Sequence, residues 1–148
     1  MSSLIGKNPN NASAIIPYYK KKVLLQKRSN NPKIYYPGFW GCFGGALNQN
    51  ESYEKAIIRE FKEETNINLI QSSFKYLMNV DFTIPIKKLI IRRRFYVYKI
   101  ISIQTFKKEF LLGEGDDYSF FNIKSFNNLN KVVPYDKLAI DNFFHILK

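Results

Sequence analysis

The chain has 148 residues, a length that suits one domain with a substantial core. Hydrophobic residues make up 45% of it and aromatic residues 16%, so we expect a folded chain and exclude a disordered one. Lysine and arginine number 23 against 12 aspartate and glutamate residues, which gives a formal net charge of +11. This excess favours an anionic partner, whether nucleotide, nucleic acid or acidic membrane surface, without choosing among them.

Other classes are excluded by what the sequence lacks. A single cysteine, Cys42, cannot form a disulfide framework, and with the single histidine, His145, it cannot make a zinc cluster. Residues 1–13 have no basic start followed by an apolar run, so we expect no signal peptide. No apolar run approaches the length of a membrane span. We therefore expect a cytoplasmic protein with no membrane partner, with a flexible tail over residues 1–12 and one domain over residues 13–148.

In chain order, the first half of the sequence predicts short strands divided by polar turns. Residues 14–19 and 23–27 form the first two strands, on either side of a lysine turn at residues 20–22. A third strand is expected over residues 39–45, after the strong turn signal Asn-Asn-Pro at residues 30–32.

A helix is expected next, with Ser52 as its N-cap and its end near Glu64. The serine hydroxyl accepts a bond from an orphan N–H of the first turn, and Glu54 complements the positive helix end. Lys55 stands where a capping box has glutamate or glutamine, so that box is incomplete.

The second half of the chain predicts more strands and a closing helix. The expected strands cover residues 74–82, 89–101 and 118–121, with a turn over residues 83–88, a short helix around Ile123, Phe126 and Leu129, and a final helix over residues 134–147. This order of elements indicates an α/β fold, a mixed sheet covered by helices.

The expected helix carries a cluster of carboxylates where its apolar stripe continues. Residues three and four apart share a helix face, so Glu60 neighbours both Glu63 and Glu64. A solvated charged face is the ordinary interpretation of such a cluster. Because these acids interrupt the buried stripe, we favour a site for a hard divalent cation such as Mg²⁺, which takes oxygen ligands. Arg59 is expected to bridge back to Glu51 and fix the preceding loop.

The spacing of these residues resembles the Nudix box, a motif with fixed offsets between its glycines, glutamates and arginine. The matching residues are Gly45, Glu51, Arg59, Glu60, Phe61, Glu63, Glu64 and Ile67. Asn66 stands where the family has its second glycine, and asparagine tolerates the left-handed conformation better than other non-glycine residues. By this resemblance Arg59 belongs to the catalytic set, while Gly45 and Glu51 have structural roles.

The resemblance implies a fold and a reaction. Nudix domains are α/β/α sandwiches with a mixed sheet, and their common activity is metal-dependent hydrolysis of a nucleoside diphosphate linked to another group. It implies Mg²⁺ or Mn²⁺ held by Glu60, Glu63 and Glu64, with help from the carbonyl of Gly44. Glu60 is alternatively the base that acts on water. Glu114 is the other candidate for base or extra ligand, weighed against a solvated loop acid of no function.

Substrate-binding residues are expected on a basic strand and among aromatic residues before the box. Strand alternation sends Arg92 and Arg94 to one face and the residue between them to the other. We expect Arg92 and Arg94 to face phosphate, and weigh this evenly against an exposed strand face. Tyr36, Phe39 and Trp40 are candidates for stacking on a base, with ordinary packing as the alternative, above all for Trp40.

The sequence therefore leaves two functions open. The first is a metal-dependent pyrophosphohydrolase acting on a nucleoside triphosphate or a nucleotide sugar. The alternative is a non-catalytic module that senses a nucleotide or binds RNA, which the positive charge suits. The carboxylate cluster favours the first, and nucleic acid is the less favoured partner because the basic residues are spread over the whole chain. The sequence leaves a homodimer open.

Overall fold

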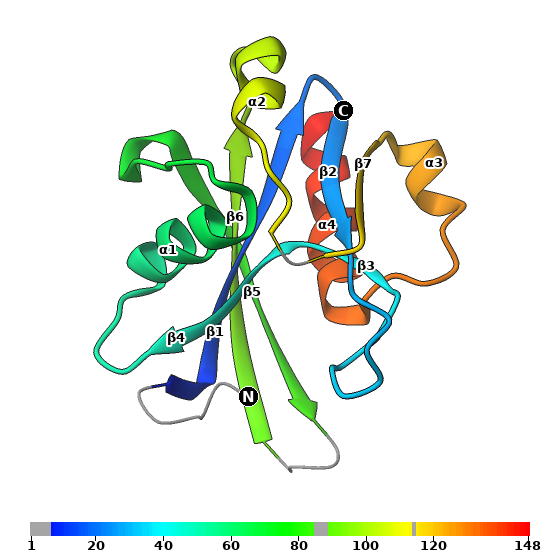
Figure 1. The fold of residues 1–148 in the computed structure, drawn as a ribbon. Coiled ribbons are helices and arrows are strands. Elements are labelled where there is room, and N and C mark those ends of the chain that lie inside the picture. Colours follow the sequence, from blue (N-terminus) through cyan, green and yellow to red (C-terminus); the bar gives the residue numbers. More distant parts are fainter. Residues whose placement is uncertain (1–6, 85–88, 114) are drawn as a thin grey trace.

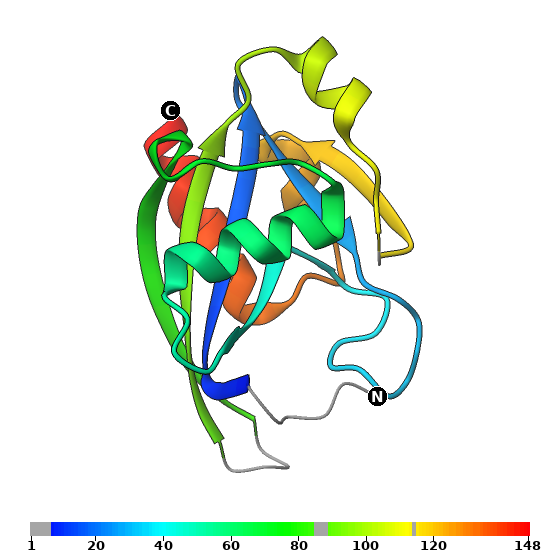
Figure 2. The same ribbon diagram turned by 60° about the vertical axis from the view of Figure 1, so that its left-hand side comes forward.

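The computed structural model describes residues 7–84, 89–113 and 115–148. In these residues a seven-stranded mixed sheet lies between two layers of helices, which confirms the expected α/β/α sandwich (Figures 1 and 2). The strands are β1 Lys7–Tyr19, β2 Lys22–Lys27, β3 Trp40–Gly41, β4 Phe43–Asn48, β5 Phe74–Ile84, β6 Leu89–Lys99 and β7 Asp117–Phe121. The helices are α1 Tyr53–Thr65, α2 Ile103–Glu109, α3 Ile123–Asn127 and α4 Pro134–Leu147, with a 3₁₀ turn at Gln71–Ser73.

Strand β1 is the centre of the sheet. It runs parallel to β6 along one edge, and β6 in turn pairs with β5 in antiparallel fashion. On its other edge β1 pairs with β2 only at Tyr18 and Tyr19 and with β4 before that. Beyond the hairpin, β2 pairs instead with β3 and β7. The two strands therefore part, and the chain from β3 to β4 crosses the gap between them.

Alternation along the strands builds two cores, one on each face of the sheet. Ile15 packs in the core under α1, while its neighbour Ile16 packs in the core under α4. In β6, Phe95 and Tyr96 divide in the same way. Helix α2 adds Phe106 to the α1 side, and the short helix α3 lies on the α4 side. Figure 2 shows α1 in front of the sheet and α4 behind it.

Three elements differ from the sequence expectation. Strand β1 begins at Lys7, so residues 7–12 of the expected tail belong to the sheet, where their backbone pairs with β4 and β6. Helix α2 was not expected at all, because residues 100–112 were left as an extension of the β6 strand and a loop. The expected turn at residues 83–88 is strand as far as residue 84, and residues 85–88 lie outside the described part of the chain. None of the helices in the described ranges is long and apolar enough to cross a membrane.

Candidate functional site

Helix α1 begins and ends as its sequence predicts. The Ser52 hydroxyl accepts from the N–H of Lys55 at 3.1 Å, and Glu54 lies in the first turn. The helix ends at Asn66, whose backbone is left-handed with φ of 65°. Its N–H donates to the carbonyl of Lys62, which closes the last turn. Asparagine at this position therefore does what glycine does at most helix ends.

Glu60 lies against the backbone of β4. A Cβ placed on Gly45 would stand 2.7 Å from the carboxyl carbon of Glu60, closer than side chains pack. Glycine at position 45 is therefore required for this carboxylate to approach the strand.

Glu64 is the most enclosed of the three carboxylates, with 4% of the residue exposed. Its Oε1 accepts from the Gly44 N–H at 2.7 Å, and its Oε2 accepts from the Gln26 amide at 2.8 Å. Bonds from N–H donors to a carboxylate stabilise its charged form inside the protein. These two bonds fix the position of the Glu64 carboxylate between β2 and β4.

Arg59 forms the predicted bridge to Glu51. Its Nε donates to Oε2 of Glu51 at 2.9 Å and its Nη2 to Oε1 at 2.8 Å, a two-pronged pair. The bond to Glu51 is the largest reason that the pKa of Arg59 lies above its usual value. The same guanidinium reaches the Ala46 carbonyl at 3.1 Å. The loop between β4 and α1 is therefore fastened to the helix, which fixes the position of the carboxylates.

A polar pocket of about 530 Å³ brings these residues together. It lies in the gap where β1 and β2 part. Its lining consists of Gln26, Arg28, Ser29, Ile34, Gly44, Gly45, Glu60, Glu63, Glu64, Arg93 and Gly115. The predicted carboxylates and glycines thus share one cavity, with arginines from β6 and from the end of β2 facing them.

Six of the residues that line this pocket were not predicted from the sequence, among them Gln26, Arg28 and Arg93. Gln26 is a polar residue within the apolar run of β2, and this interruption was a sequence signal that could have pointed to it. In the structure only 6% of Gln26 is exposed. Arg28 and Arg93 carried no signal that separates them from the other basic residues. Their positions depend on how the two helix layers pack.

The pocket's donor set suits a divalent cation, although its present arrangement is not a finished site. Among the described residues, no three His, Cys, Asp or Glu side chains form a ready metal cluster. Arg59 Nη1 lies 2.8 Å from Glu60 and 3.5 Å from Glu63, while N–H donors hold Glu64. The Glu63 side chain is 54% exposed and can turn inward without breaking a buried bond. Carboxylate oxygens are the ligands that Mg²⁺ and Mn²⁺ prefer.

The structure places Arg92 and Arg94 outside the lining of the polar pocket. Arg92 pairs with Asp81 across the β5–β6 ladder at 2.9 Å, with both side chains at least half exposed. The Arg94 guanidinium lies 4.1 Å from the centre of the Tyr53 ring. Of the three consecutive arginines, Arg93 is the one that lines the polar pocket. The alternation of the arginine side chains along β6 was predicted correctly, but the side chain that reaches the polar pocket lies on the face opposite to Arg92 and Arg94.

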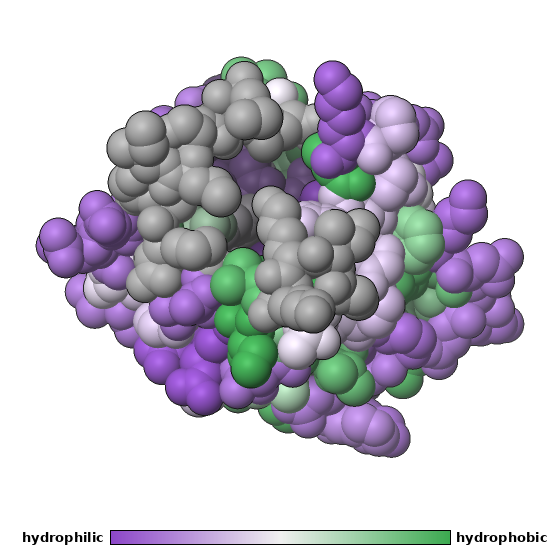
Figure 3. Space-filling view, turned by 90° about the horizontal axis from the view of Figure 1, so that it is seen from below, coloured by the Kyte–Doolittle hydropathy of each residue, from purple (hydrophilic) through white to green (hydrophobic). Residues whose placement is uncertain are grey.

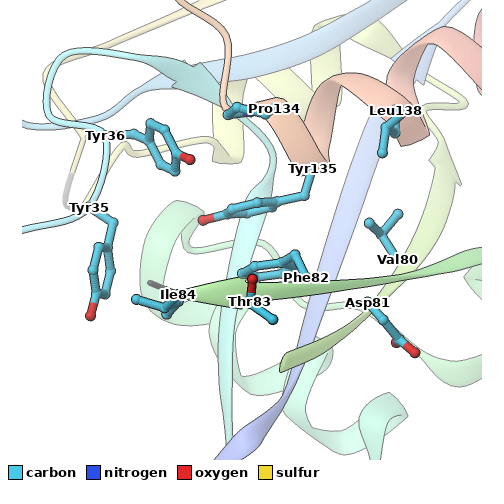
Figure 4. Close-up of a pocket in the computed structure, with 10 residues that line it drawn as sticks. All are labelled: Tyr35, Tyr36, Val80, Asp81, Phe82, Thr83, Ile84, Pro134, Tyr135 and Leu138. Atoms are coloured by element: carbon cyan, nitrogen blue, oxygen red, sulfur yellow. The ribbon is translucent and has the colours of Figure 1, made fainter. Parts of the chain in front are cut away.

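A second pocket, of about 630 Å³ and lined mainly by aromatic and aliphatic side chains, lies beside the first; we call it the aromatic pocket. Figure 4 shows it between the loop that carries Tyr35 and Tyr36, the end of β5, and the first turns of α4. The rings of Phe82 and Tyr135 stack in parallel with centres 3.8 Å apart. Figure 3 shows this end of the molecule from below, where hydrophobic residues lie beside hydrophilic ones.

The aromatic candidates divide between this pocket and the core. Tyr36 lines the pocket, and Phe39 packs behind it with ring centres 5.3 Å apart. Trp40 packs edge-on against Phe121 in the core under α4, which is the alternative weighed for it.

Comparison with known proteins identifies the family. The NUDIX domain description matches residues 8–143 of the chain. The chain belongs to the Nudix hydrolase family. An ADP-ribose pyrophosphatase of Methanocaldococcus jannaschii is 47% identical over 49 residues, which are 31% of this chain and 25% of that protein. The match thus spans only a small part of that relative's length.

Solved structures share the Nudix fold. The E. coli dihydroneopterin triphosphate pyrophosphohydrolase is 18% identical with a TM-score of 0.72, covering 96% of this chain and 99% of that one. A bifunctional NMN adenylyltransferase/ADP ribose pyrophosphatase from Francisella tularensis, in complex with AMP and a Mn ion, is 20% identical with a TM-score of 0.69. That comparison covers 96% of this chain and 43% of that one. At such identities the likeness establishes the fold alone.

The metal-binding and catalytic roles implied by the Nudix resemblance stay predictions, and for two residues the structure adds little. The Gly44 carbonyl is expected to help hold a metal. In the structure, the N–H of the same residue donates to the Glu64 carboxylate. Glu114 lies outside the described residues, although its neighbour Gly115 lines the polar pocket.

Proposed function

We propose that this Nudix hydrolase cleaves the diphosphate bond of a nucleoside diphosphate linked to a second group, with ADP-ribose as the first substrate to test. The observation that carries the proposal is the meeting of two pockets of opposite character. One holds carboxylates and arginines, the other holds aromatic rings, and Arg93 lies 5.8 Å from the Tyr135 ring where they adjoin. A nucleotide has the same two parts, a charged phosphate chain and a flat base.

The carboxylates of α1 have the chemistry to hold Mg²⁺ or Mn²⁺, and the proposed ligands are Glu60, Glu63 and Glu64. When bound, such an ion neutralises diphosphate charge and makes water a better nucleophile. The chain's own contribution is to hold these carboxylates close to the substrate phosphates. The bond from Gly44 keeps Glu64 in place, and Arg59 fixes the loop before α1.

In the proposed reaction, water attacks one phosphorus and the bond from that phosphorus to the bridging oxygen breaks. With ADP-ribose the products are AMP and ribose 5-phosphate. The proton of the attacking water passes to a carboxylate, with Glu60 and Glu114 as the two candidates. A base must come within about 3 Å of that water or act through one further water.

The aromatic pocket is the proposed site of the base. Stacking of a base on an aromatic ring is worth about 1–3 kcal/mol in nucleic-acid complexes. Tyr36 and Tyr135 both line this pocket, and their rings meet edge to face with centres 5.9 Å apart. Their hydroxyls are available to bond the base or the ribose.

The substrate is identified by incubation with Mg²⁺ and a panel of ADP-ribose, other nucleotide sugars and nucleoside triphosphates, with products separated by ion-exchange chromatography. We expect AMP from ADP-ribose and little product from triphosphates. The Glu63→Gln variant is the matched control, because that side chain is exposed and its loss leaves the fold intact. Tight binding of a panel member without any product would support the non-catalytic module instead.

A further inference from the structure

Arg93 is a nearly buried cation at the edge of the polar pocket. Its side chain is 11% exposed, and its Nε donates to Oδ1 of Asp136 at 2.8 Å. Its Nη2 lies 3.4 Å from the other oxygen of the same carboxylate. Burial by itself lowers the pKa of Arg93, but the Asp136 charge, the bond to Asp136 and smaller contributions from Tyr135 and Cys42 together outweigh it, so the pKa lies above its usual value. Arg93 therefore keeps its charge inside the fold.

Asp136 is held on several sides, so it fixes the direction of Arg93. It stands in the first turn of α4, where a carboxylate is favoured by the helix end. Its Oδ2 accepts from the Cys42 N–H at 2.9 Å. A Cβ on Gly41 would lie 2.8 Å from the same oxygen, so only glycine leaves room for it. The carboxylate thus ties α4, the β3–β4 crossing and β6 together.

The rings around Arg93 place it between the two pockets. Its guanidinium carbon lies 5.4 Å from the centre of the Phe95 ring and 5.8 Å from that of Tyr135. Tyr135 lines the aromatic pocket and stacks on Phe82, while Arg93 lines the polar pocket. A group bound to Arg93 would therefore adjoin both the carboxylates and the proposed base site.

We propose that Arg93 binds the phosphate next to the nucleoside, and that Asp136 is a positioning residue that aims it. The proposal rests on the proposed function and names the phosphate contact within it. A guanidinium has five N–H donors, and the bonds to Asp136 leave others for a phosphate oxygen. Its flat fork matches phosphate geometry, and an arginine already held by a carboxylate loses little freedom on binding.

The direct test compares AMP with adenosine, which lacks the phosphate, by calorimetry in the presence of EDTA. In Arg93→Gln we expect AMP affinity to fall about tenfold or more, as for the loss of a charge-assisted bond, with adenosine affinity unchanged. Arg93→Lys should recover part of the loss because it keeps the charge without the fork. Lys99→Gln is the matched control, because it removes an exposed cation at the far end of the same strand, and it should behave as wild type.

Because Arg93→Gln leaves Asp136 buried without its partner, a second variant separates binding from folding. Arg93→Gln with Asp136→Asn removes both charges and should restore Tm towards wild type, while AMP binding stays weak. Asp136→Asn alone keeps the cation but loses its anchor, so AMP should also bind more weakly. If the double variant binds AMP as tightly as wild type, Arg93 is only structural and the proposal fails.

Failure of the inference can be told from failure of the proposed function. A wild-type chain that hydrolyses no diphosphate substrate contradicts the proposed reaction, yet the AMP–adenosine comparison needs no turnover. Wild-type affinity for AMP no greater than for adenosine overturns the role of Arg93. Hydrolysis of ADP-ribose with an unchanged KM in Arg93→Gln overturns the inference and leaves the reaction intact.

Discussion

Glu63 and Glu64 are adjacent in the sequence and differ in burial, so their amide variants should differ in stability. Glu64 is buried and accepts from Gly44 and Gln26, whereas the Glu63 side chain is more than half exposed. A bond to a charged acceptor is worth about 1.5–3 kcal/mol and one to a neutral acceptor about 1 kcal/mol. Glu64→Gln weakens one of these bonds and loses the other, because an amide has only one accepting oxygen. Relief of repulsion from the neighbouring carboxylates acts in the opposite direction.

We therefore expect Glu64→Gln to lower the free energy of unfolding by about 1–2 kcal/mol, a fall in Tm of roughly 2–8 °C for a chain of this size. Glu63→Gln loses only a 3.5 Å contact with Arg59, worth about 0–1 kcal/mol at the surface, so its Tm should change little. Thermal melting in EDTA, followed by circular dichroism, measures both variants. Both should lose kcat by orders of magnitude once Mg²⁺ is restored. A rise in Tm for Glu64→Gln would show that repulsion outweighs its hydrogen bonds and would refute this reasoning.

Three further outcomes are expected. Asn66→Ala places alanine in a left-handed conformation and should lower the free energy of unfolding by about 1–2 kcal/mol, measured by denaturant melting. Asn66→Gly should lower it less, because glycine adopts this conformation without strain. Equal losses in the two variants would contradict the role of Asn66 in ending the helix. Burial, then the Asp136 charge, raises the pKa of the Cys42 thiol, so iodoacetamide at pH 8 should leave the native protein unmodified and label it after unfolding; rapid native labelling would contradict this. Arg92→Gln with Arg94→Gln should change KM for ADP-ribose by less than about threefold, and a larger rise in a steady-state assay would return these residues to the site.

Local signals predicted the ends of the helices that carry most of the site. The N-cap serine and the asparagine after the last turn define α1, and a proline at position 134 marks the start of α4. These signals act within a few residues, so the sequence alone contains them. The Glu51–Arg59 bridge was predictable for a related reason, since the fixed offsets of the Nudix box bring the two together.

The features that were not predicted depend on tertiary packing between segments that are far apart in the sequence. Residues 7–12 are mostly polar and enter β1 through backbone pairing with β4 and β6. No side-chain pattern in this segment predicts that pairing. For the arginines of β6, alternation gave two faces, and only the positions of α1 and α4 show which face reaches the pocket. No sequence signal marks Asp136, because its partners Arg93 and Cys42 are far from it along the chain.

The central claim is that the carboxylates of α1 hold a divalent cation for hydrolysis of a nucleoside diphosphate derivative. It is tested most directly by AMP release from ADP-ribose, measured against Mg²⁺ or Mn²⁺ concentration, with wild type and Glu63→Gln side by side. We expect AMP release to rise with the metal concentration, to stop in excess EDTA and to be nearly absent in Glu63→Gln. Full turnover in excess EDTA, or wild-type rates in Glu63→Gln, would contradict it.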